Sequence, residues 1–315
     1  MAEAGRVPRV LVVPSDFRAG PWACRSLART GYDVVAVQVD GRLAGGRSLA
    51  CPRPLRYPAG REDPAALVGA LRAMVRERGI DAVLPTSEDV VRVLAEAGGD
   101  LGAVVVGPDA SQYARLCDKG ALAEAAAEAG VDHPVSRIVG PGGAIGPDVP
   151  LPCVVKPRIS GEDAHGVAVA ATVRTAAEME AAIASLVAQG RDALVQQLLE
   201  GPRWVGHSVG LGGRFRFIAF RAIADYPRRW GPGWFLRTAD APAGVREATE
   251  RLAALVGYEG PVSLSFIEDG GRLYVHDVNL RLGATVGASI RAGFDLPRDA
   301  VDVALGRAAA PEAPR

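Results

Sequence analysis

Two lysines stand out because every other basic residue of the sequence is an arginine. Of the 36 basic side chains, only Lys119 and Lys156 are lysines, and the other 34 are arginines. A lysine ammonium is a compact point charge on a flexible stem, which suits contacts to phosphate oxygens, whereas a planar guanidinium favours bidentate partners. The count alone does not distinguish phosphate-binding lysines from two lysines that lie on the surface without a function. The residues next to them in the sequence decide between these interpretations.

Lys156 stands between an apolar run and a glycine-containing loop. The run 153–155 predicts a buried strand that carries the lysine at its end, and Pro157 stops this strand because proline lacks a backbone N–H. The loop that follows contains Ser160, Gly161, His165 and Gly166. His165 could contact a phosphate, or it could be an ordinary exposed loop histidine.

A third polar group lies near the end of the chain, at Asp277, Asn279 and Arg281. In a strand these residues share one face, because the side-chain period is two. Carboxylate and amide oxygens are ligands that Mg²⁺ accepts, and Arg281 could stabilise charge on a transferring phosphoryl group. Alone, the segment is compatible with a polar strand end. Together with the two lysines it predicts a site for phosphate and magnesium.

The first 107 residues alternate between strand and helix patterns. Strands are predicted at 10–13, 33–39, 82–84 and 103–106, and helices at 21–29, 63–79 and 89–97. Leu67, Leu71 and Met74 form the predicted buried stripe of the second helix. Such alternation predicts a parallel sheet with helices on both faces.

Dinucleotide binding by this first unit is disfavoured. The loop after the first strand contains no G-x-G-x-x-G, so its backbone cannot approach a pyrophosphate, and Asp16 would face it with the wrong charge. Asp40, the candidate ribose ligand at the end of the second strand, is therefore interpreted as a turn residue.

The remaining elements are expected in the following order. A long alanine-rich helix over 111–129 contains Lys119, and a helix over 175–188 leads to a strand over 193–197. Strands over 205–211 and 214–221 form an antiparallel pair, and a helix over 245–256 precedes strands over 262–267 and 273–279. His207 is expected on the surface, and His276 is expected to face away from Asp277 by strand alternation.

Composition limits the function classes. The formal net charge is zero and aromatic residues make up 5%, which does not favour a nucleic-acid partner. The four cysteines form no CxxC pair, and no apolar stretch reaches 18 residues, so neither a zinc site nor a membrane span is expected. The protein is therefore expected in the cytoplasm.

Four motifs in sequence order resemble those of the ATP-grasp superfamily over nearly the whole chain. They are Asp118-Lys119 followed by Gly130-Val131 and Pro134, Val154-Val155-Lys156-Pro157 with its loop to Gly166, Val195-Gln-Gln-Leu-Leu-Glu-Gly201, and Val275-His-Asp-Val-Asn-Leu-Arg281. The sequence is most similar to the carboxylate–amine ligase branch and to the ATP-binding halves of carbamoyl-phosphate synthetase. Pro85-Thr-Ser-Glu88 also resembles the N-terminal domain of that branch.

The resemblance implies a mixed α/β chain with an ATP-grasp fold. Residues 1–107 would form a Rossmann-like α/β domain and residues 108–315 the ATP-grasp domain, with a small β-rich lid at about 150–199. The implied activity is that of an ADP-forming ligase, which activates a small-molecule carboxylate as an acyl phosphate and joins it to an amine as an amide. A homodimer without nucleic-acid or membrane partners is expected.

The resemblance also implies cofactors, ATP and Mg²⁺, and a role for each motif residue. Lys119 and Lys156 would contact the α- and β-phosphates, and the loop from Ser160 to Gly166 would close over them. Asp277 and Asn279 would hold Mg²⁺, and Arg281 would contact the γ-phosphate or the acyl phosphate, so that Arg281, Lys156 and Asn279 are the catalytic residues. Adenine would meet the hinge residues Gln196, Gln197, Leu198, Leu199 and Glu200.

Several positions depart from the family pattern. Gln197 replaces a common glutamate of the hinge, and Arg203 and Trp204 stand where a ribose-binding glutamate often lies. Ser265 replaces a metal-binding acid, Asp277 a longer glutamate, and Leu280 a proline. Fewer charged oxygens predict weaker binding of a second Mg²⁺. An alternative is therefore a degenerate ATP-grasp protein that binds nucleotide and regulates without ligase activity.

The sequence offers little evidence about the carboxylate substrate. Arg221 and Arg237 flank a segment rich in proline, glycine and tryptophan and could bind a carboxylate bidentately. In a chain with 34 arginines they could equally be ordinary surface residues.

Overall fold

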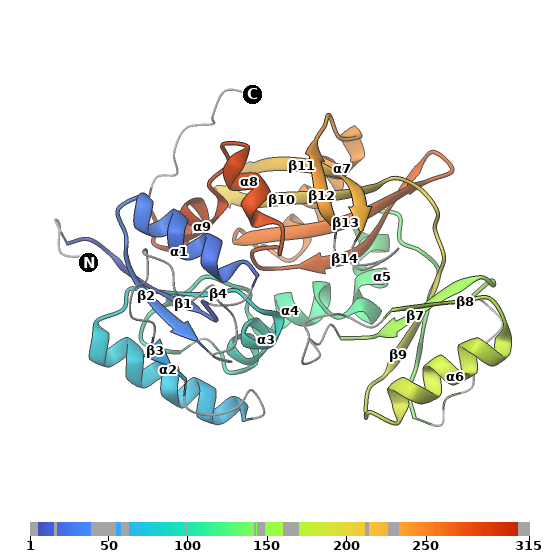
Figure 1. The fold of residues 1–315 in the computed structure, drawn as a ribbon, viewed down its shortest axis with the longest axis horizontal. Helices are drawn as coiled ribbons and strands as arrows, with labels where there is room; N and C mark the ends of the chain where they lie inside the picture. The colour runs from blue at the N-terminus through green and yellow to red at the C-terminus, as the bar shows by residue number, and fades with distance from the viewer. Residues whose placement is uncertain are drawn as a thin grey trace.

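A computed structural model shows three β-sheets with helices packed on them in the part of the chain that it describes (Figure 1). The structure describes residues 6–15, 18–38, 55–57, 63–98, 100–141, 143, 149–159, 170–211, 214–225 and 233–307. In Figure 1 the first sheet and the small sheet with α6 lie on opposite sides of the molecule, and the large sheet lies above them.

The first sheet is parallel and has the strand order β3-β2-β1-β4-β5. Its strands are β1 (Arg9–Val13), β2 (Asp33–Gln38), β3 (Leu55–Arg56), β4 (Ala82–Pro85) and β5 (Val104–Val105), and the accompanying helices are α1 (Gly20–Arg29), α2 (Pro64–Arg78) and α3 (Glu88–Glu96). Along β1, Val10 and Val12 pack on the α1 side, whereas Leu11 and Val13 pack on the α2 and α3 side. The predicted parallel sheet with helices on both faces is confirmed.

Helix α2 begins and ends as the sequence predicts. The side chain of Asp63 accepts a hydrogen bond from a backbone N–H of the first turn, and Gly79 ends the helix with a left-handed φ of 59°. The buried stripe is Leu67, Val68, Leu71 and Val75. Met74, which was predicted to belong to this stripe, is only partly buried.

Two helices from the C-terminal part of the chain also cover the first sheet. They are α8 (Val286–Arg291) and α9 (Leu296–Ala304), neither of which the sequence pattern predicts. Val286, Leu296 and Val301 share one core cluster with Val10 and Val12 of β1. The contact between α1 and the start of α9 therefore joins distant residues, since Ser26 donates to Asp295, 269 positions away.

The large sheet is antiparallel and has the strand order β12-β11-β10-β13-β14. Its strands are β10 (Arg203–Leu211), β11 (Arg214–Asp225), β12 (Gly233–Thr238), β13 (Pro261–Asp269) and β14 (Arg272–Asn279). The predicted antiparallel pairs are confirmed as β10–β11 and β13–β14, and β12 is an additional strand. Helix α7 (Ala243–Leu255) covers one face, where Leu252 packs with Trp204 and Phe266.

The small sheet has the strand order β6-β9-β7-β8 and carries α6 (Ala176–Val187). Its strands are β6 (Ser136–Val139), β7 (Cys153–Pro157), β8 (Ala171–Val173) and β9 (Ala193–Gln197). The sheet begins before the expected lid range of 150–199, because β6 pairs with β9 along its whole length. The division of the chain into domains at residue 107 stays a prediction.

The long helix expected over 111–129 is wrong, because the chain forms two helices there. Helix α4 (Ala110–Leu116) ends at Cys117, and α5 (Lys119–Glu128) begins after Asp118, whose backbone is extended. The Asp118 side chain accepts a hydrogen bond from the N–H of Gly120 at 2.8 Å and so caps the new helix. A cap inside an alanine-rich run overrides the helix propensity of its neighbours.

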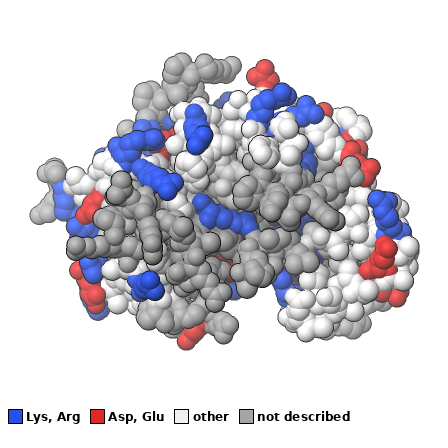
Figure 2. Space-filling model, viewed as in Figure 1, with Lys and Arg blue, Asp and Glu red and all other residues white. Residues whose placement is uncertain are grey.

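Basic and acidic side chains both occur on the face drawn in Figure 2, and several basic ones gather over α1 and α8. Arg25 of α1 and Arg291 of α8 both lie over the ring of Trp22, at 5.9 and 5.7 Å from its centre. Within the described ranges, no helix is long and apolar enough to cross a membrane.

Candidate functional site

Side chains from the four predicted motifs converge between the small sheet and the large sheet. The Nζ atom of Lys119 lies 3.3 Å from Oδ1 of Asp277. The Nζ atom of Lys156 donates to Oε1 of Gln196 at 2.9 Å and to the backbone oxygen of His276 at 3.3 Å. Segments that are far apart in the sequence thus form one polar cluster.

Lys119 reaches this cluster because the helix is interrupted between α4 and α5, so that Lys119 begins a new helix. Asp118, the cap of α5, accepts hydrogen bonds from Nε and Nη2 of Arg158, at 2.9 and 2.7 Å. Arg158 follows β7, so the cap is tied to the strand that carries Lys156. Gly120 allows the close approach of α5 to the small sheet, because a Cβ atom there would lie 2.1 Å from Ile138. Both lysines are therefore positioned by the same junction.

A β-bulge positions Asp277. Opposite β14, Ser265 pairs with Asp277 but Phe266 already pairs with Val275, so His276 is the extra residue. Because the bulge interrupts the alternation, His276 does not face away from Asp277 as predicted. Both side chains are partly exposed, between the buried residues Val275 and Val278.

Asn279 and Arg281 continue the polar row along the chain. The side-chain amide of Asn279 donates from Nδ2 to Oδ2 of Asp277 at 2.8 Å. Its Oδ1 accepts from Nη2 of Arg281 at 3.0 Å. The orientation of the amide is thereby set by one acceptor and one donor, and the three predicted residues are in direct contact.

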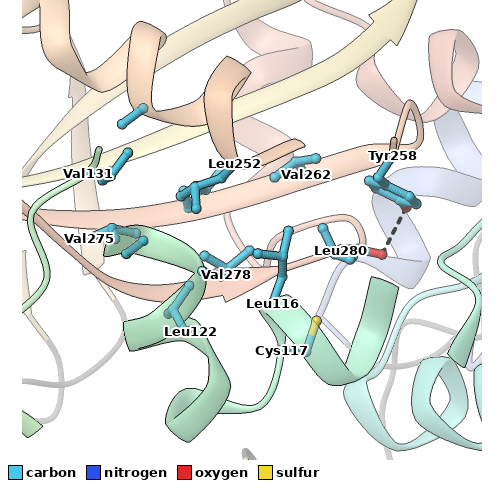
Figure 3. Packing of buried hydrophobic residues seen from close by; sticks show 14 of the residues in the cluster. Leu116, Cys117, Leu122, Val131, Leu252, Tyr258, Val262, Val275, Val278 and Leu280 are labelled. Atoms are coloured by element: carbon cyan, nitrogen blue, oxygen red, sulfur yellow. Dashed lines mark hydrogen bonds between the residues drawn. The ribbon is translucent and has the colours of Figure 1, made fainter. Parts of the chain in front are cut away.

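An apolar core beneath the site holds its two sides together (Figure 3). Leu116, Cys117 and Leu122 from α4 and α5 lie against Val275 and Val278 of β14 in this view. The hydroxyl of Tyr258 donates to the backbone oxygen of Leu280 at 3.1 Å and fixes the chain just after β14. Close packing of such a core limits movement of Lys119 relative to Asp277.

The two central ionisable groups of the cluster, Lys156 and Asp277, have pKa values that are shifted well below their ordinary values. Burial, with the nearby Lys119 ammonium, lowers the pKa of Lys156 from its ordinary value of 10.5 to about 7. Burial acts to raise the pKa of Asp277, but the ammonium groups of Lys119 and Lys156 outweigh it and lower that pKa to about 2. The site therefore holds a stable carboxylate beside a lysine that can gain or lose a proton near neutral pH.

Two histidines near Lys156 are additional members of the cluster. Burial and the Lys156 charge lower the pKa of His276 to about 3, and burial lowers the pKa of His133 to about 4. The Nε2 atom of His133 is buried and has no hydrogen-bond partner among the described residues. His133 lies in the segment between α5 and β6, where no sequence signal pointed to it.

The hinge residues connect the small sheet to the large sheet. Gln196 bridges the site, because its Oε1 accepts from Lys156 and its Nε2 donates to Oγ of Ser136 at 2.9 Å. The backbone N–H of Gln197 donates to the oxygen of Val135 at 2.8 Å. Leu199 is buried, Leu198 is partly buried and Glu200 is exposed. The adenine contact of this segment stays a prediction.

Gly201, directly after the hinge, is required by a close approach of two backbone segments. A Cβ atom at this position would lie 1.7 Å from the backbone oxygen of Glu268. Any side chain would therefore push the hinge away from the end of β13.

Four predicted site residues are not described by the structure, and two others lie away from this cluster. Ser160, Gly161, His165 and Gly166 lie outside the described residues. Arg221 faces Arg237 across β11–β12 and faces Trp204 across β10–β11. Because Trp204 packs in the core under α7, this register places both arginines on the face opposite to Asp277.

His207 is not the surface residue that the sequence suggested. It is fully buried, and its Nδ1 and Nε2 atoms lie 2.6 and 3.0 Å from the hydroxyl oxygens of Ser289 and Thr285. Burial lowers the pKa of His207 to about 4. Its role is to join β10 to the segment around α8.

Among the described residues, no group of three or more histidine, cysteine, aspartate or glutamate side chains could hold a metal ion alone. The cluster offers one carboxylate, one amide oxygen and one guanidinium from Asp277, Asn279 and Arg281, close to the ammonium groups of Lys119 on α5 and Lys156 on β7. This arrangement can bind an oxyanion, and it can accept a divalent cation that brings further oxygen ligands with it.

Comparison with solved structures shows the ATP-grasp fold. The chain is similar to the L-amino acid ligase from Bacillus licheniformis, with a TM-score of 0.74 and 17% identity over 95% of this chain and 74% of that chain. It is also similar to a biotin carboxylase–ATP complex from Campylobacter jejuni, with a TM-score of 0.75 and 17% identity over 97% and 72% of the two chains.

A third similar structure is the biotin carboxylase domain dimer of the 2-oxoglutarate carboxylase from Hydrogenobacter thermophilus, in complex with MgADP, ADP and bicarbonate. The TM-score is 0.71 and the identity 18%, over 95% of this chain and 70% of that chain. The sequence matches no protein-family model and no curated protein.

Proposed function

We propose that this protein is an ATP-dependent carboxylate–amine ligase that releases ADP and phosphate. The observation that carries the proposal is the convergence of Lys119, Lys156 and Asp277 between the small and large sheets of an ATP-grasp fold. Two similar structures are complexes with ATP or with ADP, and a third is an L-amino acid ligase, which supports both the nucleotide and the reaction class.

In the proposed reaction, an oxygen of the substrate carboxylate attacks the γ-phosphorus of ATP, and the bond from that phosphorus to the bridging oxygen of ADP breaks. The amine nitrogen then attacks the carbonyl carbon of the acyl phosphate, phosphate leaves, and the nitrogen loses a proton. Lys119 and Lys156 contact phosphate oxygens, and Arg281 stabilises the charge of the transferring group. Closure of the small sheet would exclude water from the acyl phosphate.

The donor set of the cluster fits one Mg²⁺ ion bound together with ATP. Asp277 supplies the charged oxygen ligand and Asn279 an amide oxygen, and phosphate oxygens and water would complete the coordination. When bound, Mg²⁺ neutralises phosphate charge. Ser265, opposite Asp277 on β13, offers no second carboxylate.

We predict that the wild-type protein binds one Mn²⁺ ion per chain in the presence of ATP, and that Ser265→Glu binds two. The new carboxylate would stand directly across from Asp277, where a second ion would gain a charged ligand. Mn²⁺ binding followed by electron paramagnetic resonance gives the stoichiometry, and Ser265→Gln is the neutral control of equal size. Two ions in the wild type would contradict the prediction.

We also predict that ATP affinity falls about tenfold per pH unit between roughly pH 7.5 and 9, because ATP binds the protonated form of Lys156. Its pKa of about 7 lies inside the measurable range, whereas His133, His276 and Asp277 titrate at about 4, 3 and 2 and keep their charge there. Calorimetry at several pH values in buffers of different ionisation enthalpy measures affinity and proton uptake together.

Stability is expected to change with pH in the opposite direction to ATP affinity. The pKa of Lys156 is lowered in the folded chain, so the unfolded chain binds more protons between pH of about 7 and 10.5. The free energy of unfolding should therefore rise with pH across this window for the protein without ATP. A flat affinity profile in the wild type would show that Lys156 is already fully protonated at pH 9.

The ligase reaction is tested with a panel of amino acids and other small acids, with hydroxylamine as the amine. Hydroxamate formation together with ADP release, dependent on both acid and Mg²⁺, supports the proposal. Conversion of ATP to AMP with every acid that reacts would contradict an ADP-forming ligase. A homodimer, as in one similar structure, is proposed as the assembly and is tested by light scattering.

A nucleotide-binding protein without ligase activity is the second candidate. It is favoured by Ser265 on the metal side and by Arg203, a cation at the start of β10 whose charge acts on His276. This candidate predicts tight ATP binding with no hydroxamate from any acid of the panel. The proposed ligase predicts both binding and product.

A further inference from the structure

Glu88 links the first sheet to the candidate site. It begins α3, directly after β4, and is only 3% exposed. Its Oε2 accepts a hydrogen bond from Nε of Arg281 at 2.8 Å, and its Oε1 accepts one from the hydroxyl of Tyr113 at 2.8 Å. Both carboxylate oxygens are therefore held by partners that follow the first sheet in the sequence.

This contact extends into an unbroken series of polar contacts. Arg281 donates to Glu88 and also to Asn279. Asn279 in turn donates to Asp277, and Asp277 pairs with Lys119. Each step is 3.3 Å or shorter. The orientation of a side chain at the start of α3 can thus affect the orientation of the metal-side carboxylate and of a phosphate-side lysine.

Glu88 fixes Arg281 relative to a distant part of the chain. The guanidinium of Arg281 also donates to Oδ1 of Asn279 and to the backbone oxygen of Leu282, both within two residues of the arginine. Neighbours so close in sequence move with the arginine, whereas Glu88 lies 193 positions away. Of these three acceptors Glu88 is the charged one, and charged acceptors form the stronger hydrogen bonds.

The environment suits an ionised carboxylate at position 88. The side chains of Glu88 and Arg281 are only 4% and 12% exposed, so the pair is shielded from screening by solvent. The carboxylate also lies in the first turn of α3, a nine-residue helix, where the helix dipole favours negative charge. The charged and neutral partners on its two oxygens fix the geometry of this buried carboxylate.

We infer that Glu88 is a positioning residue for phosphoryl transfer: it holds the guanidinium of Arg281, and through Asn279 the carboxylate of Asp277, in the orientation that meets the terminal phosphate of ATP. Tyr113 holds the second oxygen of Glu88. The inference rests on the proposed function. It gives the segment Pro85-Thr-Ser-Glu88 a role in the reaction, although Glu88 itself does not contact the nucleotide.

The test compares binding of ADP with binding of β,γ-imido-ATP, which carries the terminal phosphate, to the full chain with Mg²⁺. Glu88→Gln should weaken β,γ-imido-ATP about tenfold or more and ADP about twofold or less, because only the former meets Arg281. Tyr113→Phe should also weaken the binding of β,γ-imido-ATP more than that of ADP, but by a smaller factor. Glu96→Gln, at the exposed end of the same helix, is the control and should change neither affinity.

A second comparison separates positioning from a general structural role. In an Arg281→Ala background, Glu88→Gln should have no further effect on the ratio of the two affinities, because it acts only through that arginine. Equal loss of both nucleotides in Glu88→Gln, or an unchanged ratio in both Glu88→Gln and Tyr113→Phe, would overturn the inference. If Glu88→Gln does not fold, Tyr113→Phe alone decides by the same ratio.

The failure of the proposed function would look different. A wild-type protein that binds neither ADP nor β,γ-imido-ATP would contradict the use of ATP, and one that binds both but forms no hydroxamate from any acid would contradict the ligase reaction. A wild type that binds both, with variants that do not change their ratio, would leave the ligase proposal standing and remove only the role of Glu88.

Discussion

Lys156→Met is expected to lower ATP affinity by about 100-fold while the chain stays folded. Among the described residues, the ammonium of Lys156 donates to neutral oxygens, on Gln196 and His276, so its charge is available to phosphate oxygens. Losing hydrogen bonds between charged groups costs about 1.5–3 kcal/mol each, which corresponds to the expected loss. Methionine keeps the apolar stem of lysine and removes a partly buried charge, so stability should not fall.

Calorimetric titration with MgATP measures this loss, and thermal unfolding verifies that the variant is folded. Arg137→Met, on the exposed side of β6 in the same sheet, is the matched control for removing a positive charge. It should change the affinity about twofold or less, because an exposed charge is screened by solvent. Wild-type affinity in Lys156→Met would mean that the lysine does not contact ATP.

Asp299→Ala is expected to destabilise the protein by about 3–5 kcal/mol, because it leaves a buried arginine without its carboxylate. Arg216 on β11 donates to Asp299 of α9, and both side chains are buried. The Arg216 guanidinium also lies 4.9 Å from the ring centre of Phe294, so it cannot turn towards solvent without losing that contact. Arg298 donates to the same carboxylate at 2.7 Å.

Urea denaturation gives the change in the free energy of unfolding. Glu247→Ala is the control, because Glu247 pairs with Arg251 at 3.7 Å on the exposed side of α7 and should contribute about 0.5 kcal/mol or less. The double variant Arg216→Met with Asp299→Leu removes both charges, and it should recover most of the lost stability. A loss below about 1 kcal/mol for Asp299→Ala would show that Arg216 finds another partner or water.

The sequence predicted the elements whose signals are local. Periodic apolar residues, a helix cap such as Asp63 and a glycine at a helix end such as Gly79 need no distant partner, and the structure confirms them. Lys119, Lys156 and Asp277 could be assigned to one site because each belongs to a recognisable sequence motif. Their meeting in space was an expectation from the resemblance, and the ATP-grasp fold agrees with it.

The features that the sequence did not reveal depend on contacts between distant segments. The break at Asp118 is masked by alanines with high helix propensity, and it is secured by Arg158, 40 positions away. The bulge at His276 depends on the pairing of β13 with β14, which no single strand encodes. The motif at Glu88 is visible in the sequence, but its partner Arg281 lies in a distant part of the chain.

The helices α8 and α9 have a consequence for the order in which the chain can fold during synthesis. Val10, Val12, Val286 and Val301 belong to one core, and Tyr32 and Ser26 donate to Asp302 and Asp295. As the ribosome releases the first sheet, one apolar face has α2 and α3 available at once, while the other has α1 but must wait almost 200 further residues for α8 and α9. Until then the part of that face that α8 and α9 cover is exposed to chaperones and to other nascent chains. The first sheet therefore reaches its final packing only after α8 and α9 have been synthesised.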